Sequence, residues 1–252
     1  RGLKTFLKEL SVAVLVPCAG SSSRLGLGLK KEYINVTPEQ GDTVLYRALV
    51  PFFLASGCVI RCPRGEDKIF ALVSVVVVIP PETGIPLDTV SKFSERERNK
   101  ISFCAGGETR QKSVLNGLKY LCGVMPDVVL IHDGARPFVL KDLVIRVTEN
   151  VVLYGACAPC TKVTDTVKAV GTDGFVSEHL KRDFLRAVQT PQGFLYKDIY
   201  EAHVKGDRQG FVATDDTELL ELLGRKTFLC EGEPGNIKIT YPGDLDKLRE
   251  RI

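Results

Sequence analysis

Continuous apolar runs alternate along this chain with stretches in which apolar residues recur at helical spacing. The runs at 12–16, 75–79 and 128–131 are rich in valine, leucine and isoleucine, and the second predicts a strand over 73–79. Runs of this length and composition are typical of strands buried on both faces of a parallel sheet. Helical spacing follows at 110–121, between the second and third runs. This alternation predicts an α/β fold with a doubly wound, mostly parallel sheet and right-handed crossovers.

Local signals predict the remaining elements. Thr43 can cap a helix over Val44–Leu49, and Pro51 should end or kink that helix. Cys58–Lys68 is polar and predicts an irregular loop, whereas the charged run Ser94–Lys100 predicts a solvated helix or loop. The other predicted elements are strands at 101–104 and 236–240 and helices at 197–204, 216–223 and 242–251.

One segment departs from the α/β alternation. Thr161–Val170 alternates and is rich in β-branched residues, and Gly171–Gly174 is a turn followed by Phe175 and Val176. We therefore predict a β-hairpin that projects from a single domain covering 1–252, with the arm at about 157–186. A projecting hairpin of this kind is suited to contact a second copy, which predicts a homodimer.

Composition and charge narrow the classes of partner. The 252 residues carry a formal net charge of +3, so nothing favours nucleic acid or a membrane surface as partner. The apolar run at 75–79 is far too short to span a bilayer. The apolar stretch at 12–16 is also shorter than the core of a secretion signal and runs into Pro17. We expect a cytoplasmic enzyme.

Eight cysteines raise the question of a redox or metal site. Cys157 and Cys160 have the spacing of a thioredoxin-like motif, but such motifs open a helix and the sequence after Cys160 is typical of a strand. A zinc site shared with Cys58 and Cys62 would join two distant pairs. Scattered buried thiols in a reducing compartment explain the cysteines better.

The strongest chemical signal follows the first apolar run. Pro17–Gly26 is rich in glycine and serine, includes Arg24, and is followed by Lys30 and Lys31. It contains neither a P-loop nor a dinucleotide fingerprint. Small residues after a strand nevertheless let backbone N–H groups surround phosphates, and the basic side chains add positive charge. Because ligands in open α/β sheets bind at strand carboxyl ends, we predict a nucleoside triphosphate site here.

Three further strings belong to the same pattern. Gly106–Ser113 is a glycine turn that leads into a helix, and Arg186–Phe194 sets a threonine beside a proline turn. His132–Pro137 ends a buried strand with Asp133, a carboxylate suited to a metal or a substrate hydroxyl. Taken singly, these strings also fit a helix start, a proline turn and a strand end, and His132 fits a satisfied core histidine.

In combination, these strings resemble the 2-C-methyl-D-erythritol 4-phosphate cytidylyltransferase family of the non-mevalonate isoprenoid pathway, from about Ser11 to Leu248. The matching strings are Pro17–Gly20 with Arg24 and Lys31, Gly106–Gly107 with Arg110 and Ser113, His132–Pro137, Asp165–Lys168, Gln189–Gln192, Thr214–Asp216 and Asn236–Thr240. The chain departs from the family pattern at Cys18, at Glu108 and in Lys30–Glu32, and Cys58–Lys68 looks inserted.

The resemblance implies roles for individual residues. Arg24 and Lys31 would stabilise charge on the transferred phosphate, and Arg182 and Lys238 would hold the acceptor phosphate; these are the four implied catalytic residues. Asp133 would face the metal or the substrate hydroxyls. The implied substrate-binding residues are Cys18, Ala19, Gly20, Gly107, Glu108, Ser113, Asp133, Gly134, Arg136, Thr166, Thr190 and Thr214.

The resemblance also implies the reaction, in which CTP and methylerythritol phosphate give a cytidine diphospho-alcohol and pyrophosphate, with Mg²⁺ on the triphosphate. The implied fold is a Rossmann-like nucleotidyltransferase that dimerises through the arm. Three alternatives stay open at this point. They are a cytidylyltransferase that acts on ribitol 5-phosphate, a non-catalytic nucleotide-binding module and a thioredoxin-like redox protein.

Overall fold

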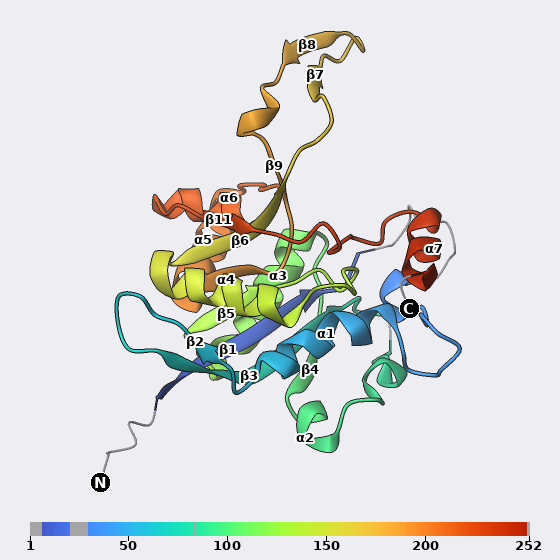
Figure 1. Cartoon of the computed structure of the whole chain (residues 1–252), viewed down its shortest axis with the longest axis vertical. Coiled ribbons are helices and arrows are strands. Elements are labelled where there is room, and N and C mark those ends of the chain that lie inside the picture. Colours follow the sequence, from blue (N-terminus) through green and yellow to red (C-terminus); the bar gives the residue numbers. More distant parts are fainter. Residues whose placement is uncertain (1–6, 21–29, 83, 251–252) are drawn as a thin grey trace.

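A computed structural model describes residues 7–20, 30–82 and 84–250. Its centre is a nine-stranded sheet in the order β11-β6-β10-β5-β1-β3-β2, with β4 paired to β3 and β9 paired to β6 (Figure 1). The strands are β1 (Lys8–Pro17), β2 (Val59–Ile60), β3 (Lys68–Ile79), β4 (Ile101–Ala105), β5 (Val128–Ile131), β6 (Ala156–Lys162), β9 (Arg186–Val188), β10 (Gln192–Leu195) and β11 (Phe228–Glu231).

The central pairs are parallel, which confirms the predicted fold class. Strand β1 pairs in parallel with β3 on one side and β5 on the other, and β6 pairs in parallel with β11. Strand β10 is antiparallel to both of its neighbours. The carboxyl ends of β1, β3 and β5 therefore meet at one edge of the sheet, where the chain crosses from one side of β1 to the other.

Helices cover both faces of the sheet because successive residues of β1 point to opposite sides. Val12, Val14 and Val16 pack with α1 (Val44–Ala55) and α4 (Lys141–Tyr154) in one core cluster. Ala13 and Leu15 pack with α3 (Arg110–Tyr120), α5 (Tyr196–Gln209) and α6 (Asp216–Leu220) in the other. The sheet is thus doubly wound, as the alternation of apolar runs predicts.

Two predictions on the first helix have different outcomes. The Thr43 hydroxyl accepts a hydrogen bond from the Tyr46 N–H at 3.0 Å, which confirms the predicted cap. Of the two expectations for Pro51, an end of the helix is wrong, because α1 continues to Ala55; a kink stays a prediction. Pro51 and Phe52 are buried against the core, and packing of this apolar face offsets the backbone hydrogen bond that proline cannot make.

The edge beyond β3 contains a second correction. Part of the predicted irregular loop, Val59–Ile60, forms β2 and pairs antiparallel with the start of β3. The strand predicted from 73 begins at Lys68, because Lys68 and Ile69 complete this pairing. The charged run contains the short helix α2 (Glu95–Arg98), whose capping box joins Ser94 and Glu97. A 3-10 turn, η3 (Leu87–Val90), precedes it.

A hairpin arm protrudes from the body (Figure 1). It contains β7 (Lys168–Val170) and β8 (Val176–His179), an antiparallel pair that forms its own two-stranded sheet. The predicted turn is confirmed, since the Gly171 N–H donates to the Phe175 carbonyl at 2.9 Å and Gly174 has a φ of +84°. The single strand predicted over Thr161–Val170 is wrong, because β6 ends at Lys162 and the chain leaves the sheet before β7.

The chain returns from the arm through η5 (Arg182–Phe184) and β9, and then enters the sheet again as β10. After α6 and the turn η6 (Glu221–Leu223), it forms β11. The strand predicted at Asn236–Thr240 is wrong, because this segment is irregular and pairs with no strand. It is held instead by single bonds such as that from the Ile239 N–H to the Ala135 carbonyl, at 2.8 Å. Helix α7 (Pro242–Glu250) follows.

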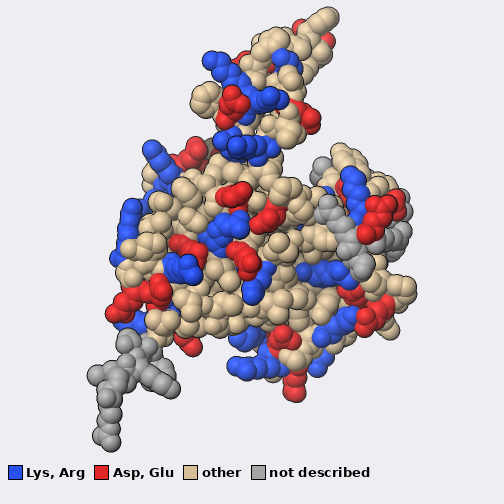
Figure 2. Space-filling model, in the orientation of Figure 1, with Lys and Arg blue, Asp and Glu red and all other residues tan. Residues whose placement is uncertain are grey.

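Charges of both signs are interspersed over the face of the body shown in Figure 2. Among the residues that the structure describes, no helix is both long and apolar enough to cross a membrane. Basic side chains are prominent on the arm in the same view, and Lys181, Arg182 and Arg186 there are exposed.

Candidate active site

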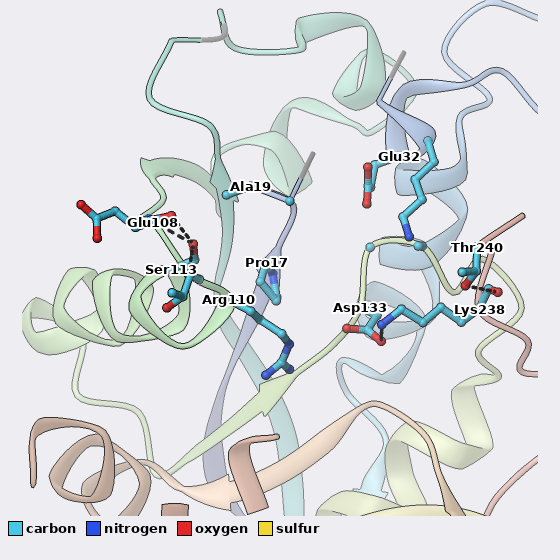
Figure 3. Close-up of a pocket in the computed structure, with 15 residues that line it drawn as sticks. Pro17, Ala19, Glu32, Glu108, Arg110, Ser113, Asp133, Lys238 and Thr240 are labelled. Atoms are coloured by element: carbon cyan, nitrogen blue, oxygen red, sulfur yellow. Dashed lines mark hydrogen bonds and ion pairs between the residues drawn. The ribbon is translucent and has the colours of Figure 1, made fainter. Parts of the chain in front are cut away.

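A pocket of about 520 Å³ opens at the carboxyl ends of β1 and β5. Five segments line it: the end of β1 at Pro17–Gly20, the 3-10 turn η2 (Lys31–Tyr33), the turn into α3, the end of β5 and the irregular segment before α7. In Figure 3, Ser113 and Arg110 lie on one side of the pocket, and Glu32, Asp133, Lys238 and Thr240 lie on the other.

The end of β1 approaches its neighbours closely because they are glycines. A Cβ on Gly106 would lie 2.4 Å from the Cβ of Ala19, and one on Gly134 would lie 2.5 Å from the sulfur of Cys18. Cys18 is buried beneath the pocket, and burial raises the pKa of its thiol well above the usual value. The thiol is therefore a packing group, and the walls are formed mainly by backbone at this end.

The turn into α3 is organised by two side chains. Thr109 caps the helix by accepting from the Lys112 N–H at 3.1 Å. Ser113 accepts from the Gly107 N–H at 3.1 Å and donates to the Thr109 carbonyl at 2.9 Å. These bonds fix the glycine turn against the pocket, so the backbone of this wall is formed in advance of any ligand.

Asp133 is the central charge of the opposite wall. Its Oδ2 lies 2.8 Å from the Lys238 Nζ and 3.5 Å from the Arg136 Nε. Burial alone would raise the pKa of Asp133, but Lys238, Arg110 and Arg136 outweigh burial and hold this pKa well below its usual value. Asp133 is therefore ionised at neutral pH, and its charge is balanced by cations from distant parts of the chain.

His132 and Thr190 support Asp133 from behind. The Asp133 N–H donates to the Thr190 hydroxyl at 3.0 Å, and this hydroxyl lies 3.0 Å from His132 Nδ1. His132 Nε2–H donates to the Arg136 carbonyl at 3.2 Å, because a carbonyl can only accept. Burial lowers the pKa of His132 to about 4, so the imidazole is neutral at pH 7 and its unprotonated Nδ1 accepts from the Thr190 hydroxyl.

The turn η2 supplies basic and acidic side chains. The Lys31 Nζ donates to the Ile239 carbonyl at 2.9 Å, and the Lys30 Nζ donates to the Cys18 carbonyl at 3.0 Å and to that of Gly20. Between these lysines and the end of β5 lies Glu32, which is 6% exposed. Burial raises the pKa of Glu32. Lys31 was predicted as a site residue, whereas Glu32 was assigned no role.

Arg110 is the first residue of α3 and is held by a buried pair. Its Nη2 lies 2.6 Å from Asp216 Oδ2, and Asp216 Oδ1 lies 3.2 Å from His203 Nε2. Burial alone would lower the pKa of Arg110, but Asp216 and Asp133 raise it. Asp215, the residue before Asp216, caps α6, and its carboxylate accepts a hydrogen bond from the Gln192 amide at 2.9 Å. Strings that are far apart in the sequence are therefore joined by buried polar contacts.

The structure brings together most of the predicted site residues. Those that line the pocket are Ala19, Gly20, Lys31, Gly107, Glu108, Ser113, Asp133, Gly134 and Lys238. Cys18, Arg136 and Thr190 pack behind it, while Thr214 is exposed beside α6, where its hydroxyl donates to Glu218 at 2.8 Å. Thr166 and Arg182 lie on the arm, with Arg182 donating to the Thr164 carbonyl at 2.9 Å. Arg24 lies outside the described residues.

Three residues of the site were not predicted as such. Arg110 and Asp216 belong to the strings that carried the resemblance, and Glu32 was noted only as a departure from it. The signal for Arg110 was its position as the first helical residue after a glycine turn. The partnership with Asp216 and His203 could not be predicted, because it depends on how α3, α5 and α6 pack.

The cysteines form no metal centre among residues 7–20, 30–82 and 84–250, where no three ligating side chains are grouped to hold an ion. All eight are free thiols. Cys157 and Cys160 lie on β6 and do not open a helix as a thioredoxin-like motif would.

The sheet order, the pocket at the strand ends and its ring of basic side chains define a nucleotidyltransferase of α/β type. The chain belongs to the 2-C-methyl-D-erythritol 4-phosphate cytidylyltransferase family, whose model matches residues 12–250. The resemblance found in the sequence is thereby confirmed.

Relatives and solved structures agree with this assignment. The chain is 37% identical over 237 residues to the 2-C-methyl-D-erythritol 4-phosphate cytidylyltransferase of Geobacillus thermodenitrificans, covering 94% of each chain. It is 39% identical over 238 residues to that of Pelotomaculum thermopropionicum, covering 93% of this chain and 91% of the relative. The fold is similar to a crystal structure of the enzyme from Thermus thermophilus, with 30% identity, a TM-score of 0.71, and coverage of 94% and 98%. It is also similar to the 4-diphosphocytidyl-2C-methyl-D-erythritol synthase from Anaerococcus prevotii, with 28% identity, a TM-score of 0.77 and 96% coverage of both.

Proposed function

We propose that this chain transfers the cytidylyl group of CTP to 2-C-methyl-D-erythritol 4-phosphate and releases pyrophosphate, as a step of isoprenoid biosynthesis. Family membership supports the reaction. The observation that carries it is the convergence of Lys31, Arg110 and Lys238 on the pocket that contains Asp133. Three cations in one preformed pocket suit a reaction between two polyanions, because both phosphates must approach each other.

In the proposed reaction, a phosphate oxygen of the acceptor attacks the α-phosphorus of CTP. The new P–O bond forms as the bond to the β-phosphate bridging oxygen breaks, and the electron pair leaves with pyrophosphate. Negative charge grows on the phosphorus oxygens and on the leaving group. Lys31 and Lys238 would stabilise this charge, so catalysis consists of positioning and electrostatics. Arg24, four residues after Gly20 in the sequence, would add to it.

Lys238 must exchange partners during this reaction. In the ligand-free chain its ammonium group is paired with Asp133 at 2.8 Å. An incoming phosphate would compete for the same ammonium group, while Arg136 stays beside Asp133 at 3.5 Å and limits the cost of separating the pair. Asp133 would then be available to a hydroxyl of the substrate. We assign Lys238 to the acceptor phosphate on this basis.

The cytosine ring would lie at the α3 end of the pocket. Ser113 accepts from the Gly107 N–H and donates to the Thr109 carbonyl, so it orders the turn, and backbone groups of Ala19 and the carbonyl of Gly107 would read the edge of the base. Glu108 lines the same wall. A preformed backbone wall can distinguish an amino group from a carbonyl, because the wrong base leaves buried groups unpaired.

The arm supports the proposal of a homodimer. Arg182 and Thr166 were expected to bind the acceptor, yet both lie on the protruding arm and neither lines the pocket of its own chain. Phe184 is 82% exposed and Phe175 is 76% exposed. A second copy would cover these rings and would receive the arm at its pocket, so that each site uses residues of both chains.

Magnesium fits this pocket as a companion of the triphosphate. Mg²⁺ is usually bound through one or two carboxylates together with substrate phosphates, and two carboxylates, those of Asp133 and Glu32, line this pocket. When bound, Mg²⁺ would neutralise charge on the triphosphate oxygens. The protein would supply only one or two carboxylate oxygens, and substrate phosphates and water would supply the other ligands. We also propose a place in the cytoplasm, which is in keeping with eight cysteines that form no disulfide in the structure.

Product analysis tests the function. The protein is incubated with CTP, Mg²⁺ and either methylerythritol phosphate or ribitol 5-phosphate, and the products are identified by mass spectrometry together with pyrophosphate release. We expect the cytidine diphospho-alcohol only, or far faster, with methylerythritol phosphate. Faster turnover of ribitol 5-phosphate would instead assign the chain as a ribitol 5-phosphate cytidylyltransferase. Pyrophosphate release with neither acceptor would contradict the proposal altogether.

A further inference from the structure

Glu32 is a pocket carboxylate whose burial the reaction above does not explain. Its side chain is 6% exposed, and Oε2 has no hydrogen-bond partner among the described residues. Its Cγ packs against Gly134, where a Cβ would approach it to 3.4 Å. The residue also lines the pocket, and in Figure 3 its carboxyl group lies across the open space from Ala19, on the side of Asp133. A buried carboxylate oxygen of this kind requires a partner, and none comes from the described parts of the chain.

The neighbours of Glu32 indicate what that partner is. Lys31 and Lys30 flank it in sequence, and their ammonium groups are directed to the carbonyls of Ile239, Cys18 and Gly20. The region in front of Glu32 is therefore the phosphate side of the pocket. A bare carboxylate there would repel a triphosphate, whereas a divalent cation between the two would convert repulsion into attraction.

Asp133 is less suited to this task. Its Oδ2 is shared by Lys238 and Arg136, so a metal at that oxygen would compete with two cations. Glu32 Oε2 carries no such pairing in the described chain. We infer that Glu32 supplies the protein carboxylate for the divalent cation that accompanies CTP, either directly or through a metal-bound water. The inference rests on the proposed function, because it takes CTP as the ligand.

The test compares the affinity for CTP with and without the metal, in the absence of acceptor so that no turnover occurs. Calorimetric titrations with CTP are run at pH 8 in Mg²⁺ and again in EDTA. The ratio of the two dissociation constants measures how strongly the cation supports nucleotide binding. Glu32→Gln keeps the shape of the side chain and removes its charge. Glu201→Gln makes the same change at an exposed position of α5 outside the pocket and serves as the matched control.

We expect Glu32→Gln to reduce this ratio by on the order of tenfold, the contribution of one charged contact, whereas Glu201→Gln leaves it unchanged. In EDTA, Glu32→Gln should bind CTP at least as tightly as the wild type, because a like charge has been removed. Binding that is weakened equally in Mg²⁺ and in EDTA leaves the ratio of the two dissociation constants unchanged. An unchanged ratio would overturn the inference. Glu32→Asp, which keeps the charge on a shorter stem, should retain part of the ratio.

Failure of the wider proposal gives a different result. If wild-type protein binds CTP in neither condition, the proposed function fails. If it binds CTP and the ratio is the same in Glu32→Gln, only the role of Glu32 fails.

Discussion

Asp133 and Arg182 carry opposite charges assigned to the same reaction, and their surroundings differ in every respect. Asp133 ends a central strand and is buried beside Lys238, Arg136 and the Thr190 hydroxyl. Arg182 lies on an exposed arm, where it donates to a carbonyl of that arm. The pocket is organised within one chain, whereas Arg182 and the aromatic rings of the arm are exposed on the surface of that chain. The contrast separates a pocket that is organised within one chain from an arm that, in the proposed homodimer, would complete the pocket of a second chain.

The sharpest test of the preformed half is the choice of base. We expect kcat/KM for CTP to exceed that for UTP by roughly 10²–10⁴, because a wall of fixed backbone groups leaves mismatched partners against a uracil carbonyl. Steady-state kinetics with both nucleotides at saturating acceptor measures this factor. Comparable values would remove the turn at Gly107 from base recognition and leave the pocket as a phosphate site only.

The basic side chains come next in size. Lys31→Ala and Lys238→Ala should each lower kcat by on the order of 10²–10³, the usual cost of losing one preorganised group that faces developing charge. Lys226→Ala, an exposed lysine outside the pocket, is the control. Turnover near the wild-type rate in either pocket variant would exclude that lysine from the mechanism.

The pocket half should also leave a mark on the pH dependence of stability. Burial lowers the pKa of His132 from 6.5 to about 4, so between these values the unfolded chain binds a proton that the folded chain does not. The free energy of unfolding should therefore fall by roughly 3 kcal/mol as the pH drops through this window. Urea unfolding at pH 7 and pH 4.5 should show a smaller fall in His132→Gln. An identical fall in both proteins would contradict a buried neutral imidazole.

Complementation tests whether the arm serves a partner. Lys31→Ala and Arg182→Ala homodimers should each be nearly inactive. In a mixed dimer with shared sites, one site carries both lesions and the other carries none, so co-refolding equal amounts should restore up to roughly a quarter of wild-type activity. Heterodimers are verified by differently tagged chains. Recovery of nothing in verified heterodimers would assign Arg182 to its own chain's pocket.

The smallest expected effect is the change in the free energy of unfolding when Phe184 on the arm is replaced, and replacement of Phe194 serves as the control. Phe184 is 82% exposed on the arm, whereas Phe194 on β10 is fully buried. In protein diluted below the dimer dissociation constant, Phe184→Ser should change the free energy of unfolding by no more than about 0.5 kcal/mol. Phe194→Ala should lower it by about 3–5 kcal/mol. A large loss for Phe184→Ser in monomeric protein would show that the arm is packed within its own chain.

Sequence reasoning was most successful where one local signal decides the structure. The apolar runs of β1, β3 and β5 and the Thr43 cap were predictable, since burial on both faces and capping act over a few residues. Asn236–Thr240 has the composition of a strand but meets no sheet edge, because β11 pairs with β6 instead. Pro51 shows the same limit, as tertiary packing outweighs a local helix breaker. Partners across the fold, such as Arg110 and Asp216, have no local signal at all.

The bond between Arg110 and Asp216 joins positions 106 residues apart, one of them almost completely buried. Replacing Arg110 leaves the Asp216 carboxylate, whose side chain is 1% exposed, without this cation in the interior, at a cost of about 3–5 kcal/mol. Libraries that vary the Arg110 codon alone will therefore return mostly defective clones. Functional variants should instead be found when both codons are changed together, either to two apolar residues or to a pair with the charges reversed.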